Sequence, residues 1–156
     1  MDIILNPPVG VTQPDSAAQL LVGMPFDQAM QAARAIPGFI EPSGSGGEQG
    51  FISYESEMSI SIGVDRNQNV ESIEIYRPMS DFTVTYQGVN IFESAAEDVI
   101  QTLSARTVVE VEDDGLQATA PELLMAFSRD TLPDGPDDED GRYFESVLIA
   151  APGYYG

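Results

Sequence analysis

Apolar and polar side chains alternate along two neighbouring stretches near the middle of the chain. Residues 58–64 alternate strictly, and residues 70–76 resume the alternation after a short polar turn at 65–69. A period of two is typical of a strand with one buried face, so these stretches predict an antiparallel hairpin with one face in water. The side chains expected to face inward are Met58, Ile60, Ile62, Val64, Ile73 and Ile75, and those expected in solvent are Glu71 and Glu74.

Two other stretches follow the 3.6-residue period of an amphipathic helix. The first begins near Pro25 and ends before Pro37, because proline suits the first helical turn and cannot continue the last. The second is predicted to begin with a capping box, in which the Ser94 hydroxyl and the Glu97 carboxylate each bind a backbone N–H. The apolar stripes are Phe26, Ala29, Met30 and Ala33 in the first helix and Ala96, Val99, Ile100 and Leu103 in the second.

Short strands account for most of the remaining chain. We expect strands over 82–86, 107–112, 116–120, 122–129 and 143–150, with the Asp-Gly pair at 114–115 favouring a tight hairpin. A chain of 156 residues suits one domain. The predicted fold class is therefore α+β, a single domain over residues 1–156 with both helices on one face of a continuous antiparallel sheet.

The chain carries an internal similarity. Residues 70–78 and 144–152 share Glu, Ser, Ile and Pro at matching positions, and each preceding strand ends in an arginine, Arg66 or Arg129. Upstream, residues 23–29 and 88–95 both open with glycine and lead to an aromatic, an acidic and an alanine residue. Three matches in the same order predict two copies of one helix-then-strands unit, approximately 20–78 and 82–152. In such a repeat Ile75 and Ile149 both face inward, and Glu71 and Glu145 both face outward.

The charge of the chain is strongly negative. It has 26 acidic residues against six basic ones, all arginine, for a net charge of −20. Such a field repels nucleic-acid phosphates and anionic lipids and attracts basic proteins. We therefore expect a basic protein partner, and neither nucleic acid nor a membrane. Acidity that only keeps the protein soluble, or that reflects an acid-biased proteome, is the alternative.

The composition excludes most common catalytic mechanisms. Histidine, lysine and cysteine are all absent, so the chain has no imidazole base, Schiff-base lysine, thiol nucleophile or thiolate metal ligand. A pair of carboxylates remains available for glycoside hydrolysis. Because Glu122 and Glu145 alternate with inward-facing residues, we expect both in solvent. We expect a non-catalytic protein without a cofactor, and a carboxylate-based hydrolase is the alternative.

A long acidic loop, residues 130–141, is expected to join the last two strands. Placing Gly141 at the glycine position of an EF-hand loop puts Pro136 and Val147 where the strongest calcium ligands belong, so we expect no metal site. A loop of this length between strands is usually either functional or disordered. The candidate partner-binding residues are Asp134, Asp137, Asp138, Glu139 and Asp140, with Tyr143, Phe144, Tyr154 and Tyr155 as aromatic anchors. A solvated turn and a tail tucked against the sheet are the alternatives.

The beginning of the sequence gives no sign of export. Residue 2 is acidic, only three aliphatic residues follow in a row, and no stretch approaches 18 apolar residues. Together with the absence of cysteine, this predicts a cytoplasmic protein.

Residues 20–36, "LLVGMPFDQAMQAARAI", followed by the hairpin at 58–78, resemble the helix-plus-sheet unit of the outer-membrane lipoprotein assembly family and of the β-lactamase inhibitory proteins. The inhibitors carry two such units in tandem, together with paired cysteines and an export signal that we do not find here. Small size, strong acidity and the ending "YFESVLIAAPGYY" also resemble small actinobacterial immunity proteins of polymorphic toxin systems. These resemblances imply an inhibitor or immunity protein that neutralises a basic toxin. A structural or regulatory interaction module is the alternative.

Overall fold

The alternating segments form a seven-stranded sheet whose neighbouring strands are all antiparallel, in the order β4-β5-β6-β12-β11-β10-β9. This computed structural model describes residues 1–7, 9–12, 19–41, 50–135 and 141–153. The strands are β4 (Phe51–Ser53), β5 (Ser59–Val64), β6 (Val70–Tyr76), β9 (Glu110–Glu112), β10 (Gln117–Ala120), β11 (Met125–Ser128) and β12 (Ser146–Ala150). A 3-10 turn, η1 (Asp113–Gly115), joins β9 to β10 at the predicted Asp-Gly hairpin.

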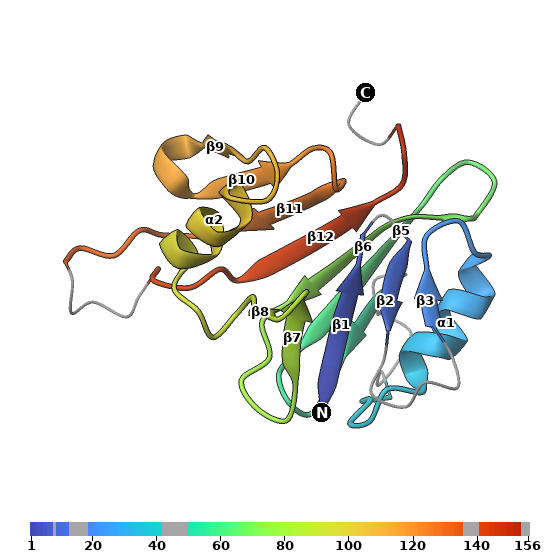
Figure 1. The fold of residues 1–156 in the computed structure, drawn as a ribbon. Helices are drawn as coiled ribbons and strands as arrows, with labels where there is room; N and C mark the ends of the chain where they lie inside the picture. Colours follow the sequence, from blue (N-terminus) through green and yellow to red (C-terminus); the bar gives the residue numbers. More distant parts are fainter. Residues whose placement is uncertain (8, 13–18, 42–49, 136–140, 154–156) are drawn as a thin grey trace.

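A second sheet of five strands packs against the first, in the order β3-β2-β1-β7-β8 (Figure 1). Its strands are β1 (Asp2–Asn6), β2 (Gly10–Thr12), β3 (Gln19–Leu21), β7 (Thr83–Tyr86) and β8 (Val89–Asn90). The β1–β7 pair is parallel. The α+β class is confirmed, whereas the single continuous antiparallel sheet is wrong, because β1, β2 and β3, which the pattern did not predict, join β7 and β8 in a second sheet.

The two helices lie at opposite ends of the five-stranded sheet. Helix α1 (Phe26–Arg34) contacts β3, and α2 (Ala96–Ser104) contacts β8. Figure 1 shows both helices and the five-stranded sheet in front of the seven-stranded sheet. The predicted capping box does not form, because α2 begins after Ala95 without a side-chain cap. Instead, the Ala96 N–H donates to the backbone carbonyl of Arg142.

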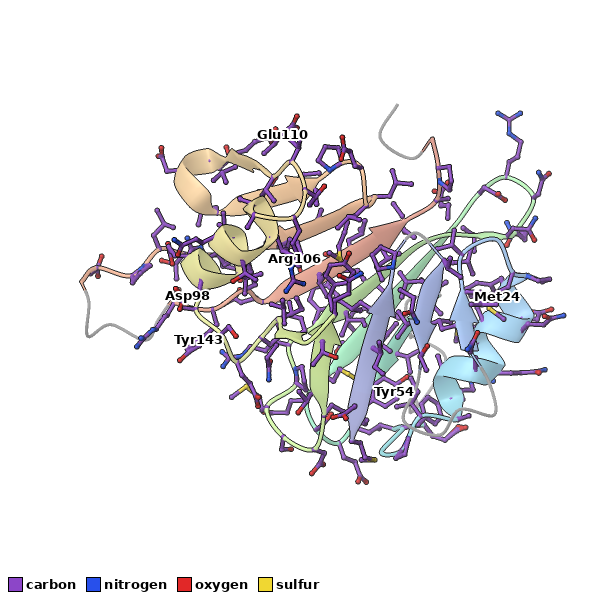
Figure 2. All side chains as sticks on the ribbon, in the orientation of Figure 1. Met24, Tyr54, Asp98, Arg106, Glu110 and Tyr143 are labelled. Atoms are coloured by element: carbon purple, nitrogen blue, oxygen red, sulfur yellow. The ribbon has the colours of Figure 1, made fainter. Side chains whose placement is uncertain are left out.

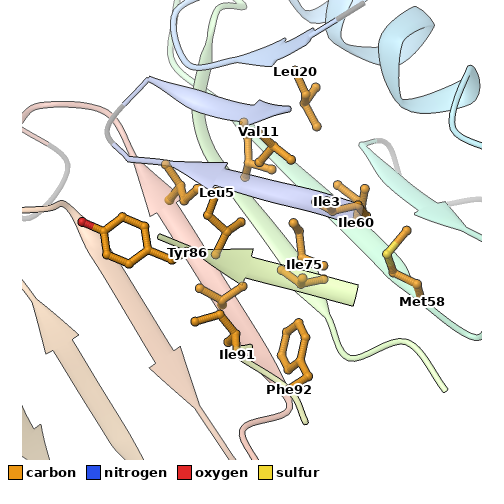
Figure 3. Close-up of a cluster of buried hydrophobic side chains, with 14 of the residues drawn as sticks. Ile3, Leu5, Val11, Leu20, Met58, Ile60, Ile75, Tyr86, Ile91 and Phe92 are labelled. Atoms are coloured by element: carbon orange, nitrogen blue, oxygen red, sulfur yellow. The ribbon is translucent and has the colours of Figure 1, made fainter. Parts of the chain in front are cut away.

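One hydrophobic core fills the space between the layers. Figure 3 shows Ile60 and Ile75 of the seven-stranded sheet near Ile3 of the five-stranded sheet. The prediction of inward-facing residues is confirmed for Met58, Ile60, Ile62, Ile73, Ile75 and Ile149, which are all buried, while Val64 is half-buried. The buried Tyr54 ties α1 to this core, since its hydroxyl donates to the Ala33 carbonyl over 2.6 Å.

Strands β6 and β12 carry the two similar segments, and they pair with each other at the centre of the sheet. Glu74 lies opposite Leu148, Ile75 opposite Val147, and Ile73 opposite Ile149. Matching residues 70–76 to 144–150 exchanges the pair Ile75–Val147 with the pair Ile73–Ile149 and returns the pair Glu74–Leu148 to itself. This register is the one expected for two copies related by a local twofold axis between Glu74 and Leu148.

The match between Arg66 and Arg129 does not hold. Gly63 lies opposite Ser72 in the first ladder, and Ser128 lies opposite Ser146 in the second. Because the repeat matches Ser72 to Ser146, it also matches Gly63 to Ser128. Arg129 therefore corresponds to Val64, two positions before Arg66. This shift matters because Arg66 is exposed in a turn, whereas Arg129 is buried.

Candidate functional site

The face of the seven-stranded sheet that points away from the core is open to solvent. Its side chains form two rows that cross all seven strands, and we call these rows the outer face. From β4 to β9, the first row is Phe51, Ser61, Glu74, Leu148, Ala126, Thr119 and Glu110. The second row is Ser53, Ser59, Tyr76, Ser146, Ser128, Gln117 and Glu112. Every residue of the first row is partly or fully exposed.

Half of the side chains of the outer face are serine, alanine or threonine, and its two aromatic residues form a pair. Phe51 and Tyr76 are 42% and 37% exposed, and their ring centroids are 6.1 Å apart in a tilted arrangement. Serine, alanine and threonine lose little conformational freedom on burial and let another backbone approach closely. Exposed aromatic rings are the residues most often found as anchors in protein interfaces.

The charges of the outer face have one sign. The acidic residues of the two rows are Glu74, Glu110 and Glu112, and none of the six arginines belongs to either row. Figure 2 shows Glu110 at the β9 edge of the molecule. Near the centre, the Tyr76 hydroxyl donates to Oε1 of Glu74 over 2.8 Å. A cation that approaches this face therefore meets only attractive charges within the two rows.

The middle of the outer face is hollowed into a groove of about 220 Å³. Its lining residues are Glu74, Gln117, Thr119, Ala126, Phe127, Ser128, Ser146 and Leu148. Across the strand pair, the Ser128 and Ser146 hydroxyls are hydrogen-bonded to each other. The groove exists because the residues along its floor are small while those on either side are longer.

The base of the acidic loop is held by Arg129, whose side chain is 1% exposed. Its Nε donates to the Gly115 carbonyl and one Nη to the Gly141 carbonyl, both over 2.9 Å. The guanidinium also pairs with Glu97, with its shortest N–O distance at 2.7 Å. A hydrogen bond from Arg129 holds the pKa of Glu97 below its ordinary value. Arg129 thus joins α2, the η1 turn and the end of the acidic loop.

The predicted loop residues are only partly described. Asp134 is exposed, whereas Asp137, Asp138, Glu139 and Asp140 lie outside the described residues, as do Tyr154 and Tyr155. Tyr143, labelled in Figure 2, is half-buried. The Arg77 guanidinium carbon lies 4.6 Å from its ring centroid.

Phe144 is fully buried and lies 5.2 Å from Phe127, measured between ring centroids. Its placement as a surface anchor is therefore corrected: Phe144 belongs to the core. The physical reason is that residues 143–145 precede β12, so the alternation of that strand does not extend to them: Phe144 packs on Phe127 in the core, while Tyr143 and Glu145 keep solvent contact.

Two carboxylates meet beside this loop. The Asp130 N–H donates to Oε2 of Glu145 over 3.3 Å. Partial burial raises the pKa of Glu145, and the adjacent Asp130 raises it further. Glu122 is exposed and accepts a hydrogen bond from the Thr107 hydroxyl. Within the described ranges, no group of three or more acidic side chains is arranged to hold a metal ion.

The exposed face of the five-stranded sheet is a second open surface. It carries Ile4 of β1, and Val9 lies in the turn between β1 and β2; these two side chains are 42% and 59% exposed, beside a hollow of about 300 Å³. The residues that line this hollow are uncharged: Ile4, Leu5, Asn6, Pro7, Val9, Tyr86 and Gln87. Among the described residues that line it, this hollow therefore lacks the combination of carboxylates and paired aromatic rings found on the outer face.

Comparison with protein-family models, curated protein sequences and solved structures finds no match to this chain. Among the described residues, no helix is long and apolar enough to cross a membrane.

Proposed function

We propose that this protein is a non-catalytic binding protein that docks a basic protein on its outer face. The observation that carries the proposal is the combination of the exposed Phe51–Tyr76 pair with charges of one sign on a face of small side chains. The aromatic rings supply apolar area for the complex, and the carboxylates steer a basic surface toward it. The long-range field of a chain with net charge −20 acts in the same direction.

The dimensions of the outer face suit a protein partner. The distance from β4 to β9 is about 29 Å, from six strand spacings of about 4.8 Å each. A stable protein–protein complex buries about 800 Å² on each partner, equivalent to a square with sides of about 28 Å. A flat face of this width is better suited to a protein surface than to a small molecule, which prefers an enclosed pocket.

Within this function, an immunity or inhibitor protein that neutralises a basic toxin is the specific proposal. A structural or regulatory module with another basic partner uses the same face and the same chemistry. A carboxylate-based hydrolase is the weaker proposal. Glu145 and Asp130 form a carboxyl pair with a raised pKa at Glu145, but the pair lies at a loop base and has Arg77 nearby, which opposes the shift.

We also propose that the chain contains two related units, 20–78 and 82–152. The symmetric register of β6 and β12 supports this proposal, as does the equal length of the two helices, nine residues each. In this arrangement β2 and β1 lie between β3 of the first unit and β7 of the second. The twofold axis would then pass through the centre of the outer face, near Glu74.

Three baits test the binding proposal in an extract of the native host. They are the wild type, the outer-face variant Phe51→Ser/Tyr76→Ser, and the control Ile4→Ser/Val9→Ser, which makes a comparable apolar-to-serine change on the five-stranded sheet. We expect a protein of basic isoelectric point to bind the wild type and the control, to be lost from the outer-face variant, and to be released as salt rises. Equal recovery by all three baits, or an acidic partner, would contradict the proposal.

The toxin proposal has its own test. If the recovered protein arrests growth when expressed alone, co-expression of the wild type should restore growth, and co-expression of Phe51→Ser/Tyr76→Ser should not. A partner that is harmless alone supports the regulatory alternative instead.

A further inference from the structure

The groove of about 220 Å³ lies across the β12–β11–β10 part of the outer face. Ala126, Ser128 and Ser146 provide its short side chains, whereas Leu148 lies on one side and Gln117 on the other. Glu74 stands beyond Leu148, three strands away from the Gln117 side. Three strand spacings amount to about 14 Å, which is long enough for an extended side chain to lie along the groove.

Glu74 is the charged residue of this lining. The Tyr76 hydroxyl donates to its Oε1 and so orients the carboxylate. A carboxylate has about four lone-pair sites, and one hydrogen bond from Tyr76 leaves capacity for further donors. Neutral oxygen acceptors follow along the groove: the Ser146 hydroxyl on the next strand, the Ser128 hydroxyl one strand farther and the Gln117 amide on the far side.

We propose that this groove binds one arginine side chain of the basic partner. A guanidinium presents five N–H donors in a plane and matches a carboxylate with two parallel hydrogen bonds. The Ser146 hydroxyl, on the strand next to Glu74, offers an acceptor for its remaining donors. The methylene stem of arginine packs on apolar surface while its head stays polar, and Leu148 and Ala126 provide that surface.

Lysine fits this groove less well. Its ammonium is a compact, strongly hydrated charge with three donors, and it does not form the planar two-point contact with a carboxylate. A groove that has one carboxylate at its side and neutral acceptors farther along matches a flat group with many donors. None of the six arginines of this chain lines the groove, so the arginine is supplied by the partner.

Nuclear magnetic resonance titration of the full chain tests the inference with small probes. N-acetyl-arginine-N-methylamide should cause saturable shifts of the backbone amide signals of groove residues, among them Gln117, Ser128 and Leu148. The citrulline analogue, which has the same shape without the charge, should cause much smaller shifts. The lysine analogue should bind several-fold more weakly than arginine, because it lacks the planar contact.

Two matched variants locate the contact. Glu74→Gln should weaken arginine binding about three- to tenfold, because it converts charge-assisted hydrogen bonds into neutral ones. Glu110→Gln removes the same charge from the same face outside the groove and should change the affinity less than twofold, since an exposed charge at that distance is screened. Equal losses in the two variants, shifts spread over all acidic surfaces, or equal binding of lysine would overturn the inference.

The inference rests on the proposed function for the source of the arginine, but the two fail separately. If the arginine probe does not bind while the host partner is still lost from Phe51→Ser/Tyr76→Ser, only the groove assignment is wrong. If the host partner binds elsewhere while the probe occupies the groove, the docking proposal is wrong and the groove remains an arginine site.

Discussion

The inner and outer faces of the seven-stranded sheet are made by the same strands and have opposite properties. On β6, Ile73 and Ile75 are buried to 1% exposure or less, while Glu74 and Tyr76 between and beside them keep solvent contact. The inner face meets the second sheet and is filled by large apolar side chains. Residues one position apart therefore serve the fold in one case and remain available for binding in the other.

Because alternate residues of a strand point to opposite faces, one set of positions contributes to stability and the other set is available for binding. A change on the inner face acts on the core, where each lost methylene group also leaves a cavity. A change on the outer face acts on a surface that water already reaches, so it alters the fold little. Variants of the two faces can therefore be compared directly.

The largest expected effect is in the core. Ile73→Ala should lower the free energy of unfolding by about 2–5 kcal/mol, because it empties part of a packed core. Leu148→Ala, a comparable truncation on the outer face, should lower it by about 1 kcal/mol or less. Urea unfolding followed by circular dichroism measures both. Similar losses in the two variants would show that the outer face is covered in solution.

Arg129 gives the next largest effect. Arg129→Ala should lower the free energy of unfolding by about 2–3 kcal/mol, because it leaves the Gly115 and Gly141 carbonyls without their guanidinium donor. Arg66→Ala removes the same charge from an exposed turn and should cost about 0.5 kcal/mol or less. If both variants unfold at the same urea concentration, the Arg129 contacts do not stabilise the loop base.

The smallest effect is a stabilisation that depends on pH. The pKa of Glu145 is raised in the folded protein by partial burial and by Asp130, so the folded state binds this proton more tightly than the unfolded state and stability falls as pH rises through that range. Glu145→Gln should therefore stabilise the protein at pH 7 by on the order of 0.5 kcal/mol, a small value because the site is partly solvated. The gain should disappear when the pH falls below the ordinary carboxyl value of 4.5. Thermal unfolding at several pH values measures it, and a gain that persists in acid would exclude the charge interaction as its cause.

The central hairpin could be predicted from the sequence, but the five-stranded sheet could not. Residues 58–64 and 70–76 are long enough for strict alternation to appear. Strands β2 and β3 have only three residues each, too few to distinguish a period of two from chance. Because β1 pairs with β7 across 81 residues of sequence, its partner is also beyond the reach of any local pattern.

The outer face was also beyond local prediction, although its residues alternate as expected. The serines of residues 59–61 indicated only a solvated side of a hairpin. Whether these serines belong to a wide surface depends on the strand order. In the structure β12 pairs with β6 and extends the face with Leu148 and Ser146. The similarity of 70–78 to 144–152 was a signal for this pairing. The spacing of Glu97 from Ser94 predicts a helix cap, whereas in the structure the Glu97 carboxylate pairs with the buried Arg129.

Because the sequence contains no cysteine, single introduced cysteines can test directly whether a basic protein docks on the outer face. Single cysteines at Ser61 on the outer face and at Thr85 on the exposed face of the five-stranded sheet can each carry a benzophenone photo-crosslinker. After irradiation in host extract, we expect a single major adduct with a basic protein from Ser61→Cys, no such adduct from Thr85→Cys, and loss of the Ser61→Cys adduct when Phe51→Ser/Tyr76→Ser is added. An adduct with the same protein from Thr85→Cys, or one that survives the loss of the aromatic pair, would contradict docking on the outer face.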